Sequence, residues 1–177
     1  MILNIRTIVI FLLLSSGIIE GQNIEIENVT ISRVALKIGE LHEEQESEGP
    51  LFTYQIKFVN NSDSILRIYP SESKFEQLFR YKNKLYSNDV VSFSLLPFLL
   101  NKKVIEISKG DFYMLEFSTR ILLGTNIRDS IDRDYDYTKE IMQILPTLRI
   151  VYKDKYNQFQ SSGINNVTIG TYTYTPK

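Results

Sequence analysis

The stretch of this sequence best suited to binding a metal ion alternates acidic residues, with Asp132, Asp134 and Asp136 each separated by one residue. Alternate aspartates can direct carboxylate oxygens toward one hard cation, as the first half of a calcium-binding loop does. The complete EF-hand pattern also needs Gly at its sixth position and Glu at its twelfth, where this chain has Tyr137 and Gln143. The segment therefore predicts a partial Ca²⁺ site; the alternative is a polar connection into a short helix that Asp136 caps.

Two tyrosines near the end of the sequence form a second candidate. Tyr172 and Tyr174 alternate with Thr171, Thr173 and Thr175, and a period of two is typical of a β-strand. Tyrosine on an exposed sheet face can stack on a sugar or on a partner protein. We therefore predict a partner-binding face at Tyr172 and Tyr174; the alternative is a strand that turns both rings partly into the core.

The single histidine, His42, begins a run that starts like the zinc-protease motif H-E-x-x-H. Glu46 stands where that motif needs its second histidine, and a catalytic zinc takes about three protein ligands. A zinc-protease site is therefore excluded. The surrounding segment 40–48 is rich in glutamate and has no Lys or Arg, which fits an exposed loop, a docking loop for a basic partner or a weak divalent-ion site.

Other catalytic signatures are absent from the sequence. It has no G-x-S-x-G, no G-x-G-x-x-G and no phosphate-binding G-x-x-x-x-G-K-[ST]. Without cysteine it can form no disulfide, thiolate metal site or cysteine nucleophile. We expect no enzymatic activity and no cofactor other than the Ca²⁺ considered above. A hydrolase that uses two carboxylates distant in the chain is the remaining catalytic alternative.

The composition is that of one folded domain: 177 residues, of which 43% are hydrophobic and 23% charged. Twenty Lys and Arg against 21 Asp and Glu leave a net charge of -1. This balance provides no general attraction to nucleic acid or to an anionic membrane.

The first segment of the sequence, residues 1–21, has the pattern of a secretory signal peptide. Arg6 precedes a short apolar run from Ile8 to Leu14, and small residues follow. The uncharged stretch is shorter than the roughly 20 residues that a spanning helix needs. We expect cleavage after Gly21, with Gly17 as the other possible site, no membrane span after cleavage, and export to the periplasm, the cell surface or the medium. The alternatives are an uncleaved signal anchor and a buried strand. An exported domain without cysteine fits a bacterial envelope.

Residues 22–177 form the predicted domain, and their apolar positions alternate in short runs bounded by turn residues. Two changes of phase within 23–38 indicate a bulge, or two strands in one stretch. A short helix is expected over 137–145, since Pro146 follows it. The other expected elements are hairpins over 51–69, 79–86, 103–121 and 148–160, and single strands over 90–96 and 167–175. This pattern predicts an all-β antiparallel sandwich with one short helix.

Three turn motifs of the sequence, in this order, resemble those of immunoglobulin-like modules in exported bacterial proteins. Residues 58–62 read Phe-Val-Asn-Asn-Ser, residues 82–84 read Lys-Asn-Lys, and residues 105–111 read Ile-Glu-Ile-Ser-Lys-Gly-Asp. The resemblance implies an immunoglobulin-like sandwich and assigns no site residue. The Cys and Trp of true immunoglobulin domains are missing.

These observations lead to one expected function and two alternatives. The expected function is an exported, non-catalytic binding module that holds an envelope protein or a glycan. The first alternative is an inhibitor or protective factor that inserts segment 40–48 or 128–136 into its target, and the second is the carboxylate-pair hydrolase. The apolar run 95–100 is expected to be buried, and to be an interaction patch if it is exposed.

Overall fold

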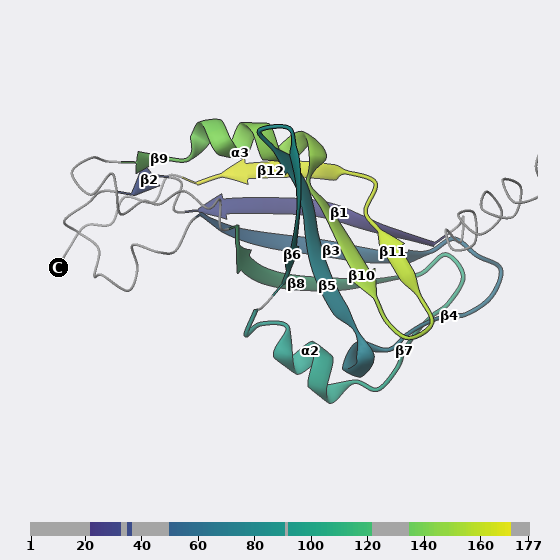
Figure 1. Ribbon diagram of the computed structural model, residues 1–177. Helices are drawn as coiled ribbons and strands as arrows, with labels where there is room; N and C mark the ends of the chain where they lie inside the picture. Colours follow the sequence, from purple (N-terminus) through teal and green to yellow (C-terminus); the bar gives the residue numbers. More distant parts are fainter. Residues whose placement is uncertain (1–21, 33–34, 37–49, 91, 122–134, 171–177) are drawn as a thin grey trace, which may run out of the picture.

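The computed structural model describes residues 22–32, 35–36, 50–90, 92–121 and 135–170. The described chain is mostly β-strand, as expected, and is built around two four-stranded sheets (Figure 1). Buried side chains from both sheets form one apolar core, so the coarse expectation of a sandwich-like all-β fold is confirmed. Within these ranges no helix has the length and apolar character needed to cross a bilayer.

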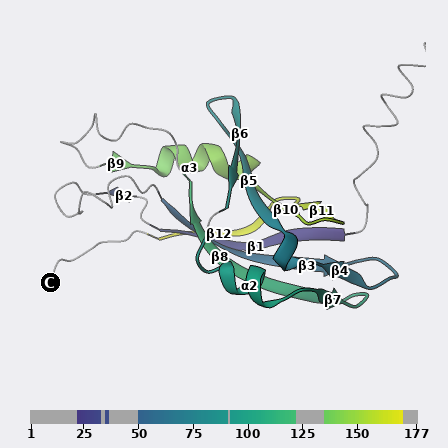
Figure 2. The same ribbon diagram turned by 60° about the horizontal axis from the view of Figure 1, so that its bottom comes forward.

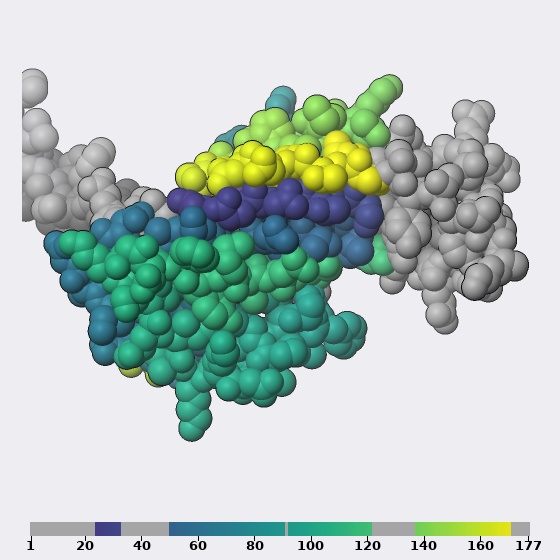
Figure 3. All heavy atoms as spheres, turned by 180° about the vertical axis from the view of Figure 1, so that it is seen from behind, coloured from purple at the N-terminus to yellow at the C-terminus, as the bar shows by residue number. Residues whose placement is uncertain are grey.

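The first sheet has the strand order β12-β1-β3-β8, which Figure 3 shows from outside as adjacent yellow, purple, blue and green bands. Its strands are β1 (Gln22–Ser32), β3 (Leu51–Asn60), β8 (Phe112–Arg120) and β12 (Ile164–Ile169). Every second residue of β3 is buried, which matches the predicted alternation. The register of β1 against β3 shifts between Ile26 and Asn28, which confirms the predicted bulge. Unlike the expected purely antiparallel arrangement, β12 runs parallel to β1.

The second sheet has the strand order β11-β10-β5-β6. Its strands are β5 (Lys74–Tyr81), β6 (Lys84–Asp89), β10 (Arg149–Lys153) and β11 (Gln158–Gln160). Lys82 and Asn83 join β5 to β6 with φ values of 47° and 62°, the left-handed backbone that a two-residue hairpin turn uses. The expected hairpins over 79–86 and 148–160 are therefore confirmed.

Aromatic rings fill the space between the two sheets. Phe75 of β5 has its ring centroid 5.4 Å from that of Phe117 on β8 and 5.2 Å from that of Tyr152 on β10. The hydroxyl of Tyr54 is also buried and accepts a 2.9 Å hydrogen bond from the Gln77 amide. Burial raises the pKa of the Tyr54 hydroxyl despite that bond, so this group stays neutral in the core.

Two of the predicted hairpins are wrong. The chain after β3 enters β4 (Leu66–Ile68), which pairs with β7 (Ile105–Ile107) and not with β3. Both edges of β3 are already taken by β1 and β8, so no backbone donors or acceptors remain there for a hairpin partner. The hairpin expected over 103–121 is likewise absent, since β8 pairs with β3 and β7 pairs with β4.

Two of the three turn motifs that carry the resemblance, 58–62 and 105–111, contact each other where these strands change partner. The Asn60 side chain is fully buried and donates from Nδ2 to the carbonyl oxygens of Ser64 (2.7 Å) and Ile107 (2.8 Å). Its Oδ1 accepts from the backbone N–H of Ser62 at 3.0 Å. The backbone N–H of Gly110 donates to the Asn60 carbonyl at 2.9 Å. Asn60 therefore joins the turn after β3 to the turn before β8, which lie side by side in Figure 1.

The described chain holds two short α-helices where one was expected. The predicted helix is confirmed as α3 (Thr138–Ile144), but its N-cap is Tyr137 and no side chain bonds the cap. Asp136 lies instead in the two-residue strand β9 (Tyr135–Asp136), which pairs with β2 (Ala35–Leu36).

The strand expected over 90–96 is wrong: none of its described residues lies in a strand, residues 93–95 form a turn, and the second helix, α2 (Leu96–Asn101), begins at its last residue. Pro97 lies in the first turn of this helix, where a missing N–H costs nothing. The short 3₁₀ helix η1 (Pro70–Glu72) contacts α2, and both lie at the side of the molecule opposite α3 (Figure 2).

Candidate binding site

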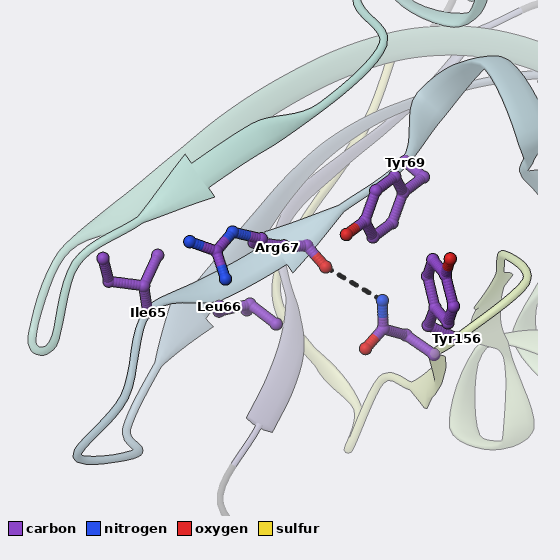
Figure 4. A pocket seen from close by; sticks show the side chains of 6 residues that line it. Ile65, Leu66, Arg67, Tyr69 and Tyr156 are labelled. Carbon is purple, nitrogen blue, oxygen red and sulfur yellow. Dashed lines mark hydrogen bonds between the residues drawn. The ribbon is translucent and has the colours of Figure 1, made fainter.

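A shallow pocket of about 220 Å³ opens between β4 and the turn that joins β10 to β11 (Figure 4). β4 and the residues beside it contribute one wall and the β10–β11 turn contributes the other. The lining residues are Ile65, Leu66, Arg67, Tyr69, Tyr156 and Asn157. The pocket therefore combines two aromatic rings with an amide, a guanidinium and backbone carbonyl groups.

Two tyrosine rings are the largest groups in this pocket. The centroids of Tyr69 and Tyr156 are 4.8 Å apart and their planes are inclined by 59°. Tyr156 is 65% exposed, so much of its ring remains available to a ligand, while Tyr69 is half-buried behind it. A second pocket of similar volume is lined by Phe112 and Tyr113, but these are consecutive strand residues whose side chains point to opposite faces.

A buried carboxylate holds both walls of the pocket. Asp154 is 7% exposed, and its Oδ2 accepts hydrogen bonds from the backbone N–H of Tyr69 (3.0 Å) and the hydroxyl of Tyr152 (2.7 Å). Its Oδ1 accepts from the backbone N–H groups of Tyr156 (2.8 Å) and Asn157 (2.7 Å). The backbones of the two pocket tyrosines are thus fixed by one side chain.

A further bond ties the two walls together directly. The Asn157 amide donates to the backbone carbonyl of Arg67 at 2.9 Å, the dashed line in Figure 4. The same amide also reaches the Asp154 carboxylate at 3.0 Å. The Asn157 and Asp154 side chains are already ordered by these hydrogen bonds, so they lose little conformational entropy when a ligand binds. This favours binding.

The charged groups around the pocket are paired with each other. The Arg67 Nε lies 2.7 Å from the Glu106 Oε1, and the Lys155 Nζ lies 2.7 Å from the Glu72 Oε1. Hydrogen bonding to Glu106 and Glu72 raises the pKa of Arg67 and Lys155, respectively. The Lys155 Nζ also lies 5.2 Å and 5.0 Å from the ring centroids of Tyr69 and Tyr156. The site therefore offers polar groups with little net charge.

The hydrogen bonds to Asp154 govern its titration. Burial alone would raise the pKa of this carboxyl, but hydrogen bonds from Asn157, Tyr152 and backbone N–H groups hold the pKa below its ordinary value of 3.8. Burial and the neighbouring Asp154 raise the pKa of the Tyr152 hydroxyl. The native pair is therefore a neutral phenol that donates to an ionised carboxylate.

This arrangement predicts acid sensitivity. The folded-state pKa of Asp154 is depressed, so its contribution to the free energy of unfolding is complete above the unfolded pKa and lost as the pH falls through the folded pKa. We expect Asp154→Asn to be less stable than the wild type by about 1 kcal/mol or more at pH 7. The difference in the free energy of unfolding between the wild type and Asp154→Asn should become smaller below about pH 4. Urea unfolding across this pH range measures it, and a pH-independent difference would contradict the assignment.

The residues predicted from sequence fall largely outside the described ranges. Asp132, Asp134, Tyr172 and Tyr174 lie outside them, as do His42 and segment 40–48, so the predicted Ca²⁺ site and tyrosine face remain predictions. The backbone of Asp136 is described as part of β9, but its side chain is not. Within the described ranges no three His, Asp or Glu side chains are grouped so as to hold a metal ion.

Sequence reasoning did not single out Tyr69, Tyr156 or Asp154. The hairpin predicted over 148–160 includes the turn between β10 and β11, but no site was predicted there. The useful signal was the spacing of Asp154 and Asn157, since Asp commonly bonds N–H groups two and three residues later. That pattern marks a turn whose tip, including Tyr156, is fixed in place.

Comparison with known proteins found no counterpart: no protein-family model, no curated protein and no solved structure matches this chain.

Proposed function

We propose that this protein is an exported, non-catalytic, immunoglobulin-like β-sandwich that serves as an interaction module of the cell envelope and holds a neutral glycan in the Tyr69–Tyr156 pocket. The observation that carries the proposal is the attachment of both tyrosine backbones to the Asp154 carboxylate. An open aromatic pair on a fixed turn suits binding better than it suits a chemical reaction, which would need a nucleophile or an acid–base pair.

The chemistry of the pocket favours a sugar over other small ligands. A tyrosine ring offers an apolar face against which the C–H face of a pyranose can pack, and its hydroxyl serves as a polar handle. The Asn157 amide, the Arg67 guanidinium and nearby carbonyl groups supply donors and acceptors for sugar hydroxyls. A shallow pocket of about 220 Å³ accommodates one or two rings of a longer chain.

The paired charges favour a neutral glycan over an acidic one. Arg67 and Lys155 each have a carboxylate within 2.7 Å. An acidic sugar would have to replace Glu106 or Glu72 as the partner of a cation, and it would lie close to the displaced carboxylate. A neutral sugar leaves both ion pairs in place.

Replacement of one exposed ring tests this proposal. A glycan array with neutral and acidic oligosaccharides identifies the ligand, and calorimetric titration with the best neutral oligosaccharide measures its affinity. We expect Tyr156→Ala to weaken that affinity by about tenfold or more, since stacking and buried area are both lost. Tyr156→Phe keeps the ring and should retain most of the affinity.

The matched control is Met142→Ala on α3, where a similarly exposed side chain (58%) is removed and the affinity should be unchanged. Absence of binding to every neutral oligosaccharide would overturn the proposal, and so would binding that Tyr156→Ala leaves intact.

A further inference from the structure

Helix α2 is apolar on both of its sides, although the core covers only one. Leu95 and Phe98 are buried. The Phe98 ring centroid lies 6.2 Å from that of Phe75 and 5.9 Å from that of Tyr113. The inner side of the helix thus closes the sandwich between β5 and β8, which partly confirms the expectation that this run is buried.

The outer side carries large apolar side chains that face solvent. Phe93 is 90% exposed, Leu100 is 74% exposed and Leu96 is 42% exposed. Their spacings of three and four residues place them on one side of a helix. The backbone N–H of Leu96 donates to the carbonyl of Phe93 at 3.3 Å, so Phe93 belongs to the same run of helical turns. We call Phe93, Leu96 and Leu100 the α2 surface.

The fold does not require apolar residues at these three positions. A helix that only closed a sandwich would be polar on its solvent side, and clustered exposed apolar side chains mark sites of interaction. In Figure 3 the teal atoms of this part of the chain project from the lower edge of the molecule. The α2 surface is therefore accessible beyond the outline of the two sheets.

The charges beside the α2 surface indicate what covers it. Lys102 and Lys103 follow the helix directly and are exposed, while residues 90–105 contain no Asp or Glu. The Lys102 Nζ lies 3.3 Å from the Tyr113 hydroxyl and 4.9 Å from its ring centroid. A second copy docked by this surface would bring like charges together, whereas an anionic lipid surface is complementary to them.

We propose that the α2 surface is a peripheral contact with an anionic lipid bilayer. Phe93, Leu96 and Leu100 enter the boundary between headgroups and acyl chains, and Lys102 and Lys103 bind lipid phosphate groups. Apolar side chains flanked by lysine are the combination that holds a protein at a membrane interface. The contact is independent of the glycan pocket, because the proposal uses none of the pocket residues.

A tryptophan introduced into the full chain tests the contact, because the natural sequence contains none. Phe93→Trp places a unique fluorophore on the α2 surface. Met142→Trp is the matched control on α3, at the opposite side of the molecule in Figure 1. With phosphatidylcholine vesicles that contain phosphatidylglycerol, we expect a blue shift of the Phe93→Trp emission and none for Met142→Trp. Vesicles of phosphatidylcholine alone should give a much smaller shift.

Further variants separate the two parts of the contact. In the Phe93→Trp background, Leu100→Ser should raise the lipid concentration at half-maximal shift by about tenfold. Lys102→Gln with Lys103→Gln should do the same for anionic vesicles. Adding Tyr156→Ala should leave that lipid concentration unchanged, so a failed glycan proposal is distinguishable from a failed lipid proposal.

The lipid proposal is overturned if the Phe93→Trp emission does not respond to anionic vesicles, which is the result expected of a surface that docks a protein. It is also overturned if both tryptophan positions shift equally.

Discussion

Asn60→Asp is expected to lower the free energy of unfolding by about 3 kcal/mol or more at pH 7. Aspartate keeps the acceptor that bonds the Ser62 N–H, but it replaces the Nδ2 donor with an oxygen. That oxygen would lie near the carbonyl oxygens of Ser64 and Ile107, which are now 2.7 Å and 2.8 Å from Nδ2. The site is fully buried, so the variant places an unpaired charge where water cannot solvate it.

Urea unfolding measures this loss, and Asn61→Asp is its matched control. Asn61 is exposed in the same turn, so the same chemical change should alter stability by about 0.5 kcal/mol or less. The loss of unfolding free energy in Asn60→Asp should become smaller at low pH, because a protonated carboxyl is neutral and can donate one hydrogen bond. A loss similar to that of the control would show that Asn60 does not join the two turns.

Asp154→Ala is expected to cost about 3 kcal/mol of stability and to abolish glycan binding. The substitution leaves the backbone N–H groups of Tyr69, Tyr156 and Asn157 without their acceptor, although Tyr69 retains a 3.1 Å contact to the Tyr152 hydroxyl. Because both pocket walls bond this carboxylate, its loss should affect binding more than Tyr156→Ala does.

Asp63→Ala is the matched control for this loss. Asp63 forms an exposed ion pair with Lys109, and exposed pairs contribute about 1 kcal/mol or less. Glycan affinity should persist in the control. If Asp154→Ala kept the wild-type affinity, the turn would not be the element that positions Tyr69 and Tyr156. If Asp154→Ala is too unstable to titrate, Asp154→Asn provides the same comparison in a milder form.

Local patterns were sufficient to predict most individual strands. The alternation of 51–60 predicted β3 with its buried and exposed faces. The phase change in 23–38 predicted the bulge after Ile26. Both features depend on neighbouring residues alone, since the side-chain period of a strand is two and an inserted residue shifts it. The same holds for the turn at Lys82 and Asn83, where the short polar pair adopts left-handed backbone.

Partner choice could not be predicted in the same way. Whether Leu66 pairs with β3 or with Ile107 depends on which edges are already occupied, which is a property of the whole sheet. The helix around Pro97 was missed because a short apolar run with one proline fits either a broken strand or a first helical turn. The pocket brings together Tyr69 and Tyr156 from distant parts of the chain, and no local pattern in a single sequence predicts that contact.

The parallel pairing of β1 with β12 has a consequence for how the polypeptide reaches its native state. The Asn165 amide bonds the Glu27 carboxylate across 138 positions of the chain, and β1 gains this neighbour only after nearly all of the described chain has been synthesised. Such non-local closure slows folding. The first sheet can therefore be completed only late in synthesis, when β12 becomes available to pair with β1.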